Sequence, residues 1–217
     1  MPDIWPVVGL SLAVSLSATT VATVLGIPLA ALLALGRFRG RRTVIVAVNA
    51  LLGLPPVVVG LLLYLTLSRS GPLGALGLLF TPAAMVAAQT MLATPIIAAI
   101  AHRALDQAWN EFGPALRVLG ATRLRALPTL LSLRRRSIAT AVLAGFGRTV
   151  SEVGAVLIVG GNIAGFTRTM TTSVVLETNM GNLERALAIG CVLVGISLAA
   201  SASVISLADR APGAEKP

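Results

Sequence analysis

The sequence predicts an all-α integral membrane protein with about five transmembrane helices. Its 217 residues are 56% hydrophobic and only 12% charged, and the mean hydropathy is +0.90. A soluble domain of this length needs many more charged side chains on its surface. The composition therefore excludes an ordinary soluble domain and points to the lipid bilayer as the main partner.

Five apolar stretches are each long enough to cross a bilayer, which takes about 20 mostly apolar residues. They cover residues 7–35, 43–67, 81–101, 137–160 and 183–207. The first is not expected to be a cleaved signal peptide, because MPDIWP has no basic segment and the apolar run exceeds about 15 residues. Residues 1–217 are predicted to form one transmembrane domain.

The arginines predict the orientation, because short loops rich in arginine stay in the cytoplasm. With five crossings, two loops and the tail share one side, with Arg37, Arg39, Arg41, Arg42, Arg103, Arg117, Arg123, Arg125, Arg134, Arg135, Arg136, Arg210 and Lys216. The other side keeps Arg69, Arg168 and Arg185. The amino terminus is predicted outside and the carboxyl terminus inside. The net charge of +9 is then a topology signal, and no nucleic-acid partner is expected.

Several kinds of chemistry are not expected. The one cysteine, Cys191, lies in the last stretch, so it is expected to be a packing residue without an intramolecular disulfide. One histidine and no cysteine cluster argue against a metal site. The only lysine is Lys216, so no glycine-rich loop ending in Gly-Lys-Ser/Thr exists. The energy source must be an ion gradient or a partner, and no cofactor is expected on this chain.

The segment GFGRTVSEVG, residues 145–154, places Arg148 and Glu152 in the middle of the fourth stretch. Residues four apart share one face of a helix. An arginine at the bilayer centre costs about 2.5 to 3.5 kcal/mol, so the pair is not expected to face lipid. Small or hydroxyl residues extend the same stripe at Ala141, Ala144, Gly145, Ser151 and Ala155.

Two interpretations of this face stay open. The pair either clamps the helix to its neighbours, or it lines and gates an anion pathway together with Thr149 and Ser151. In the second case Arg148 attracts the anion and Glu152 limits how tightly it is held. A mixed role, mainly structural and gating, is preferred.

Pro55 and Pro56 lie near the middle of the second stretch and are expected to kink or break that helix. Such breaks persist in membranes where the freed carbonyls face protein or water. Pro95 repeats the feature in the third stretch. A packing kink and a gate-forming bend are equally compatible with the sequence.

Residues 102–136 are predicted to form a long cytoplasmic loop. Within it, GPALRVLG suggests a short helix, with Pro114 at its first position and Gly120 as a left-handed stop. Its mainly apolar surface must dock, either on this protein's own helices or on a partner.

This segment resembles the EAA loop of ATP-binding-cassette importers when it is aligned on Gly120. Ala115 matches the second position, whereas Pro114 replaces the glutamate, Leu116 is third, and Leu130 takes the isoleucine position. Ser132 and Leu133 stand where Leu-Pro is usual. If the resemblance holds, the residues that couple to the ATPase are Pro114, Ala115, Leu116, Arg117, Leu119, Gly120 and Ala121.

Further motifs resemble the oxyanion branch of these importers, the molybdate, sulfate and tungstate permeases. They are the spacing of Arg148, Glu152, Gly154 and Ala155, and the sequence LPPVVVG at 54–60. The stretch VGGNIAGFTRTMTTSVVLET, residues 159–178, is most similar to tungstate permeases. Guanidinium and hydroxyl groups suit an oxyanion, so oxyanion or binding-protein contacts are expected at Asn162, Thr167, Arg168, Thr169, Thr171 and Thr172. A plain solvated loop is the alternative there.

The resemblance implies a type I importer permease core of the MetI-like kind, and no catalytic residue on this chain. It also implies a homodimer enclosing the pathway, cytosolic ATPase subunits carrying ATP and Mg, and an extracytoplasmic tungstate-binding protein. The alternatives are a molybdate or sulfate permease of the same class, a secondary anion transporter, or a membrane anchor or chaperone. Residues 170–178 are expected to form a short interfacial helix, with Asn182 capping the last crossing.

Overall fold

The computed structural model describes residues 4–210, apart from the side chains at 204, 205 and 207–210, and it contains no β-strand in that range. The predicted inner tail after residue 210, with Lys216, lies outside the described residues. The elements are α1 (Trp5–Leu35), α2 (Arg41–Ala50), η1 (Leu51–Gly53), α3 (Pro56–Leu67), η2 (Gly74–Leu76), α4 (Pro82–Val118), α5 (Leu127–Leu133), α6 (Arg135–Val150), α7 (Gly154–Gly160), α8 (Met170–Asn179) and α9 (Leu183–Arg210).

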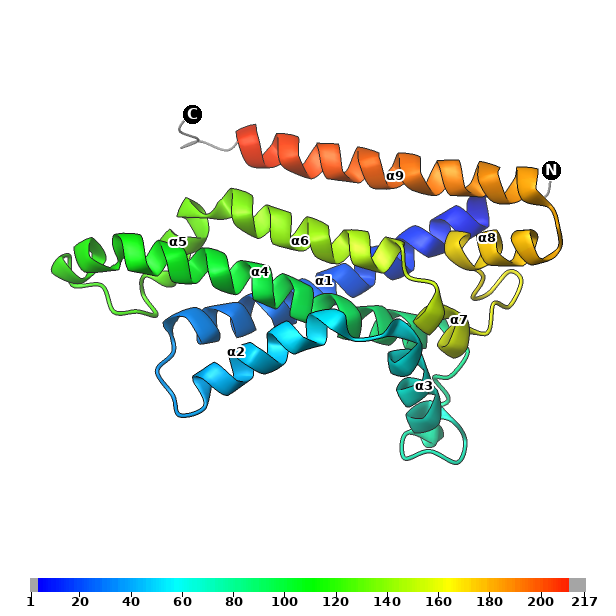
Figure 1. Cartoon of the computed structure of the whole chain (residues 1–217), viewed down its shortest axis with the longest axis horizontal. Helices are drawn as coiled ribbons and strands as arrows, with labels where there is room; N and C mark the ends of the chain where they lie inside the picture. Colours follow the sequence, from blue (N-terminus) through cyan, green and yellow to red (C-terminus); the bar gives the residue numbers. More distant parts are fainter. Residues whose placement is uncertain (1–3, 211–217) are drawn as a thin grey trace.

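The long helices α1, α4, α6 and α9 run roughly along one direction, while α3 stands across them (Figure 1). Helices α1 and α4 form the centre, and α6 packs against both. Small side chains permit this close approach. A Cβ placed on Gly26 of α1 would lie 3.1 Å from Ile97 of α4, and one on Gly145 of α6 would lie 2.6 Å from the same side chain. The Ile97 side chain of α4 thus packs directly on the backbone of α1 at Gly26 and of α6 at Gly145.

Among the described residues, three helical segments are long and apolar enough to cross a membrane alone: Trp5–Leu35, Pro82–Val118 and Leu183–Ser203. Two further candidates are bent pairs, α2 and η1 with α3 at 101°, and α6 with α7 at 56°. The five predicted stretches correspond to these segments if each bent pair counts as one span. The bend within 43–67 lies at the predicted proline break, whereas the bend within 137–160 was not predicted, because a hydropathy average does not register a change in helix direction.

The prediction of a loop over residues 102–136 is wrong for its first half. Helix α4 continues to Val118, so Pro114 lies inside a helix and does not begin one. A proline this near the end of a helix removes one backbone hydrogen bond. The neighbouring Gly113 leaves room for the Trp109 ring, since a Cβ at Gly113 would lie 3.0 Å from it. Pro95 also leaves α4 unbroken. The third span is therefore a rod that extends well beyond residue 101.

The end of this rod agrees with the sequence prediction. Gly120 has φ +78°, in the left-handed region, and its N–H donates to the carbonyl of Arg117 at 3.0 Å. The N–H of Ala121 donates to the carbonyl of Leu116 at 2.9 Å. These two bonds form a Schellman motif, so the turn after α4 has a fixed shape.

The predicted short helix at 170–178 is confirmed as α8 (Met170–Asn179). Asn182 stands directly before α9, and its carbonyl accepts the first helical bond from Ala186 at 3.0 Å. Its side-chain amide donates instead to Glu177 at 3.0 Å, so Asn182 ties α8 to the start of α9.

Candidate functional site

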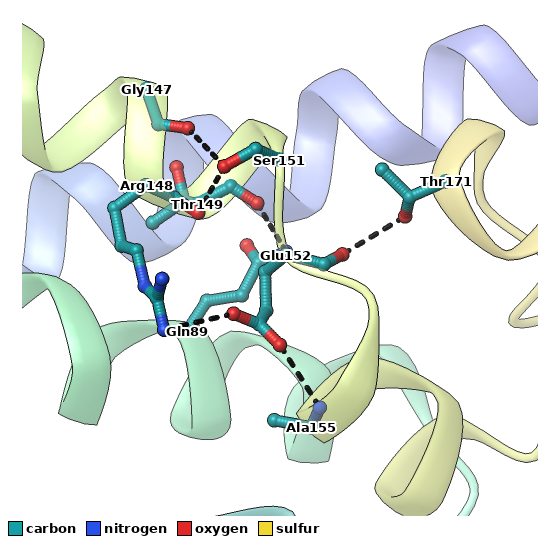
Figure 2. A network of polar contacts seen from close by, with 8 residues as sticks. All are labelled: Gln89, Gly147, Arg148, Thr149, Ser151, Glu152, Ala155 and Thr171. Atoms are coloured by element: carbon teal, nitrogen blue, oxygen red, sulfur yellow. Dashed lines mark hydrogen bonds and ion pairs between the residues drawn. The ribbon is translucent and has the colours of Figure 1, made fainter. Parts of the chain in front are cut away.

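The centre of the fourth span is a break in the helix. Helix α6 ends at Val150 and α7 begins at Gly154, and the axis turns by 56° between them. Arg148 and Glu152 therefore do not share one face of a continuous helix, and the predicted stripe of small residues is interrupted. They still form an ion pair, with Arg148 Nη2 3.4 Å from Glu152 Oε2 (Figure 2).

The Glu152 carboxylate is held by two different groups. One oxygen faces Arg148, and the other accepts a hydrogen bond from the backbone N–H of Ala155 at 3.0 Å, in the first turn of α7. That N–H has no partner within its own helix. The Glu152 side chain is 3% exposed and the Arg148 side chain 32% exposed. The guanidinium is the more accessible half of the pair, and the carboxylate anchors it.

Polar groups at the break, two backbone carbonyls and one hydroxyl, find partners on three other helices. Gln89 of α4 donates from Nε2 to the carbonyl of Thr149 at 2.9 Å. The Thr149 hydroxyl lies 3.0 Å from the hydroxyl of Thr19 on α1. Thr171 of α8 donates to the carbonyl of Glu152 at 2.9 Å (Figure 2). The bonds from Gln89 and Thr171 satisfy carbonyls that a continuous helix would have bonded itself, which is what a break inside a membrane requires.

Gln89 was not predicted as a site residue. Its side chain is 3% exposed, and its Oε1 has no hydrogen-bond partner within the described part of the chain. An amide in the middle of a membrane stretch is a visible signal, since polar side chains there are costly and usually face the protein interior. The sequence does not say which backbone group it meets.

The other predicted pathway residues differ in accessibility. Thr149 is 1% exposed and its hydroxyl is bonded internally. Ser151 is exposed, although its hydroxyl donates back to Gly147 at 2.8 Å. Of this group, Arg148 and Ser151 are the side chains that a passing ion can reach in this conformation.

The second break lies between η1 and α3. Leu54 and Pro55 are both extended, with ψ of 121° and 125°, and Pro56 occupies the first turn of α3. The predicted break at Pro55 and Pro56 is confirmed, with a bend of 101°.

The two breaks pack against each other. A Cβ on Gly60 of α3 would lie 2.8 Å from the Cα of Ala155 in α7, and one on Gly154 would lie 3.0 Å from Val57. The halves α3 and α7 are thus in direct contact. A movement of one bent half displaces the other.

The predicted outer contact residues are mostly buried. Thr167, Thr169, Thr171 and Thr172 are each 7% exposed or less. Thr169 and Thr172 form a reciprocal capping box at the start of α8. An external anion reaches these hydroxyls only if the segment opens. Arg168 and Asn162 are half-buried, and Arg168 lines a cavity of about 270 Å³ together with Glu177 and Arg185.

The turn after α4 presents apolar side chains to the outside. Val118 is 88% exposed, Leu119 81% and Leu124 79%. Beneath them, the ring of Trp109 lies 5.7 Å from the Arg117 guanidinium and 5.0 Å from that of Arg123. The predicted coupling residues 114–121 thus form the end of a rigid rod with a bare apolar tip.

Comparison with known proteins gives long and clear similarities, although no protein-family model matches the sequence. The chain is 39% identical over 212 residues to a probable anion ABC transporter permease protein of Haloferax volcanii, covering 95% of this chain and 91% of that one. It is 36% identical to the tungstate uptake system permease protein TupB of Peptoclostridium acidaminophilum, covering 96% and 92%. It is 34% identical to the molybdenum transport system permease protein ModB of Azotobacter vinelandii, covering 72% and 73%.

Proposed function

Since this chain belongs to the anion permeases of the ATP-binding-cassette transporters, we propose that it is the membrane-spanning subunit of an ATP-driven tungstate importer. The observation that supports tungstate as the substrate is the 36% identity to a tungstate permease over 96% of the chain. The motifs at 159–178 support the same substrate. A molybdate permease of the same class is the second candidate, because the molybdenum permease of Azotobacter vinelandii is 34% identical. Sulfate, an oxyanion like tungstate and molybdate, is the further alternative substrate.

A permease subunit is not itself an enzyme, so ATP hydrolysis belongs to partner ATPases. ATP and Mg bind there, and this chain binds no cofactor. The proposed assembly contains two copies of this chain, two cytosolic ATPase subunits and an extracytoplasmic tungstate-binding protein in the cell membrane. The type I, MetI-like core and the outside position of the amino terminus are part of this proposal. Family membership removes the secondary transporter and the anchor from the alternatives.

The coupling path follows from the length of α4. Gln89 and Leu119 are thirty residues apart on or at the end of one helix, a distance of about 45 Å at 1.5 Å per residue. The apolar tip at Val118 and Leu119 is suited to a groove on the ATPase, because burying exposed apolar side chains at an interface is favourable. Rotation of the rod then moves Gln89, which holds the carbonyl of Thr149.

The break is proposed to act as the gate. Arg148 offers a positive charge to an oxyanion, while the buried Glu152 keeps that charge partly neutralised and prevents tight retention. Because α3 packs on α7, both bent halves are expected to move together. Passage between two copies of the chain supplies the room that one copy lacks.

The test is uptake into liposomes that contain this chain and its ATPase, with the binding protein loaded with tungstate or with molybdate. The proposal expects uptake that requires both ATP and binding protein, with tungstate outcompeting molybdate. Liposomes with the same proteins but without ATP serve as the control for leakage. Uptake that favours molybdate would keep the mechanism and change the substrate, whereas uptake independent of ATP would contradict the proposed function.

A further inference from the structure

Arginines from two distant parts of the sequence meet at the end of α1. The loop between α1 and α2 and the connection after α4, residues 119–126, line a shallow, open pocket of about 520 Å³. Its lining residues are Gly36, Arg37, Phe38, Arg39, Arg41 and Arg123. None of these residues belongs to the break, and only Arg123, 5.0 Å from the Trp109 ring, also lies next to the apolar tip. The mechanism above assigns the pocket no role.

Two of the guanidinium groups are fixed by the end of α1. Arg41 donates from Nε to the carbonyl of Leu33 and pairs through Nη2 with Asp106 at 2.9 Å. Arg123 donates from Nη1 to the carbonyl of Leu35 at 3.2 Å. The last carbonyls of a helix have no partner within it, so these bonds complete α1. Each guanidinium has five N–H donors, and the remaining ones are available to a ligand.

The positive charge in the pocket is only partly balanced. Asp106 pairs with Arg41, whereas Arg37 and Arg39 are exposed and form no ion pair within the described residues. Partial burial, followed by the positive charges of Arg37, Arg117 and Arg41, lowers the pKa of Arg123, while Asp106 acts in the opposite direction. Four guanidinium groups around one opening match the oxygens of a phosphate, which accepts several charge-assisted hydrogen bonds.

We propose that this pocket binds the phosphate of an anionic phospholipid and thereby bridges the loop between α1 and α2 to the connection after α4. The shared chemistry is a phosphate, and three observations favour a lipid as its source. The pocket directly follows α1, one of the helices that are long and apolar enough to cross a membrane alone. Phe38 lines the opening and is 39% exposed. Val46 on the adjoining α2 is 62% exposed.

The position fits the headgroup region of a bilayer, whichever side of the membrane this end occupies. Basic pockets beside membrane helices at this depth attract anionic headgroups. The exposed valine offers a surface for the acyl chains, and the aromatic ring suits the interface. Because Arg123 lies three residues beyond Gly120, a bound phosphate holds the connection after α4 against α1.

The test measures retention of lipid on the purified full chain by native mass spectrometry. The probes are phosphatidylglycerol, phosphatidylcholine and inorganic phosphate, each titrated separately. The test variant is Arg37→Gln/Arg39→Gln, because these two side chains line the pocket, are exposed and form no ion pair within the described part of the chain. The matched control is Arg42→Gln/Arg125→Gln, which removes the same charge from exposed residues outside the pocket.

The expected result is binding of phosphatidylglycerol that is about 30-fold weaker in the test variant, at about one factor of five per arginine, and unchanged in the control. Equal weakening in both variants would overturn the proposal, because a diffuse surface charge would then explain the binding. Binding of inorganic phosphate without retention of phosphatidylglycerol would overturn the lipid as the source. Equal retention of phosphatidylcholine would do the same. None of these outcomes depends on transport, so the inference and the proposed function fail separately.

Discussion

The two bent spans reach similar shapes by different physical means. The break before α3 is made by Pro55 and Pro56, which remove backbone donors and force their preceding residues into extended conformations. The break between α6 and α7 contains no proline at all. It is stabilised by hydrogen bonds with Thr19, Gln89 and Thr171, on three other helices.

The difference separates a local cause from a tertiary one. A proline break is present even in an isolated segment, because it follows from covalent structure. A polar break exists only when its partners are in place, so its free energy depends on where α1, α4 and α8 lie. The second kind is suited to a gate, because moving one partner helix changes its stability.

The largest effect is expected from Arg148→Ala. Glu152 would then be a buried carboxylate without its cation, a situation that costs about 3 to 5 kcal/mol. The protein is expected to insert in the membrane but to lose uptake, measured with the reconstituted liposomes. Expression in the membrane fraction controls for insertion. Normal transport by Arg148→Ala/Glu152→Ala would contradict any role of the pair in gating.

The proline break is expected to respond only to a double substitution. In Pro55→Ala, Pro56 still keeps residue 55 extended, and in Pro56→Ala, Pro55 still keeps Leu54 extended. The double variant lets the helix continue and is expected to lower uptake about tenfold, whereas each single variant changes it about twofold or less. Distances between spin labels on α2 and α3 measure the bend. Equal loss in a single variant would show that one proline carries the break.

The contact between the two bent halves is tested by Gly60→Ala. The added Cβ meets the Ala155 backbone at 2.8 Å, which a rigid neighbour cannot relieve, so a loss of about 1 to 3 kcal/mol is expected. The matched control is Gly53→Ala, where a Cβ would meet nothing within 4 Å. Thermal unfolding in detergent measures both. Equal stability of the two variants would mean that α3 and α7 do not pack this closely.

The smallest effect is expected from Thr171→Val. It removes one hydrogen bond to the carbonyl of Glu152 and should cost about 1 kcal/mol. The control on the same helix is Thr178→Val, whose hydroxyl donates to the carbonyl of Val174 within α8. Uptake should fall modestly in Thr171→Val and stay unchanged in the control. A larger loss in Thr178→Val would argue that α8 matters for reasons other than the break.

Sequence reasoning found much of the site but misplaced some of its geometry. Arg148 and Glu152 were identified from charge within an apolar stretch, and the pair forms as predicted. The assumption of a continuous helix was wrong, because spacing alone carries no signal for a break without proline or for an acceptor such as the carbonyl of Glu152. Gln89 stands out in the sequence as an amide within an apolar stretch, but its role cannot be predicted, because its hydrogen-bond partner Thr149 lies sixty residues away. The burial of the outer threonines could not be predicted either, because in a sequence the hydroxyls that cap a helix look the same as hydroxyls that bind an anion.

The sequence by itself determined the membrane class, the apolar stretches, the proline break and the glycine stop at the end of α4. Each of these follows from local composition or from the backbone limits of one or two residues. Only the tertiary structure decided that α4 is one rod, that the fourth span breaks at Ser151, and that the two breaks touch. Those features depend on hydrogen bonds and close contacts between residues far apart in the chain. Their partners become available only when the helices are packed together.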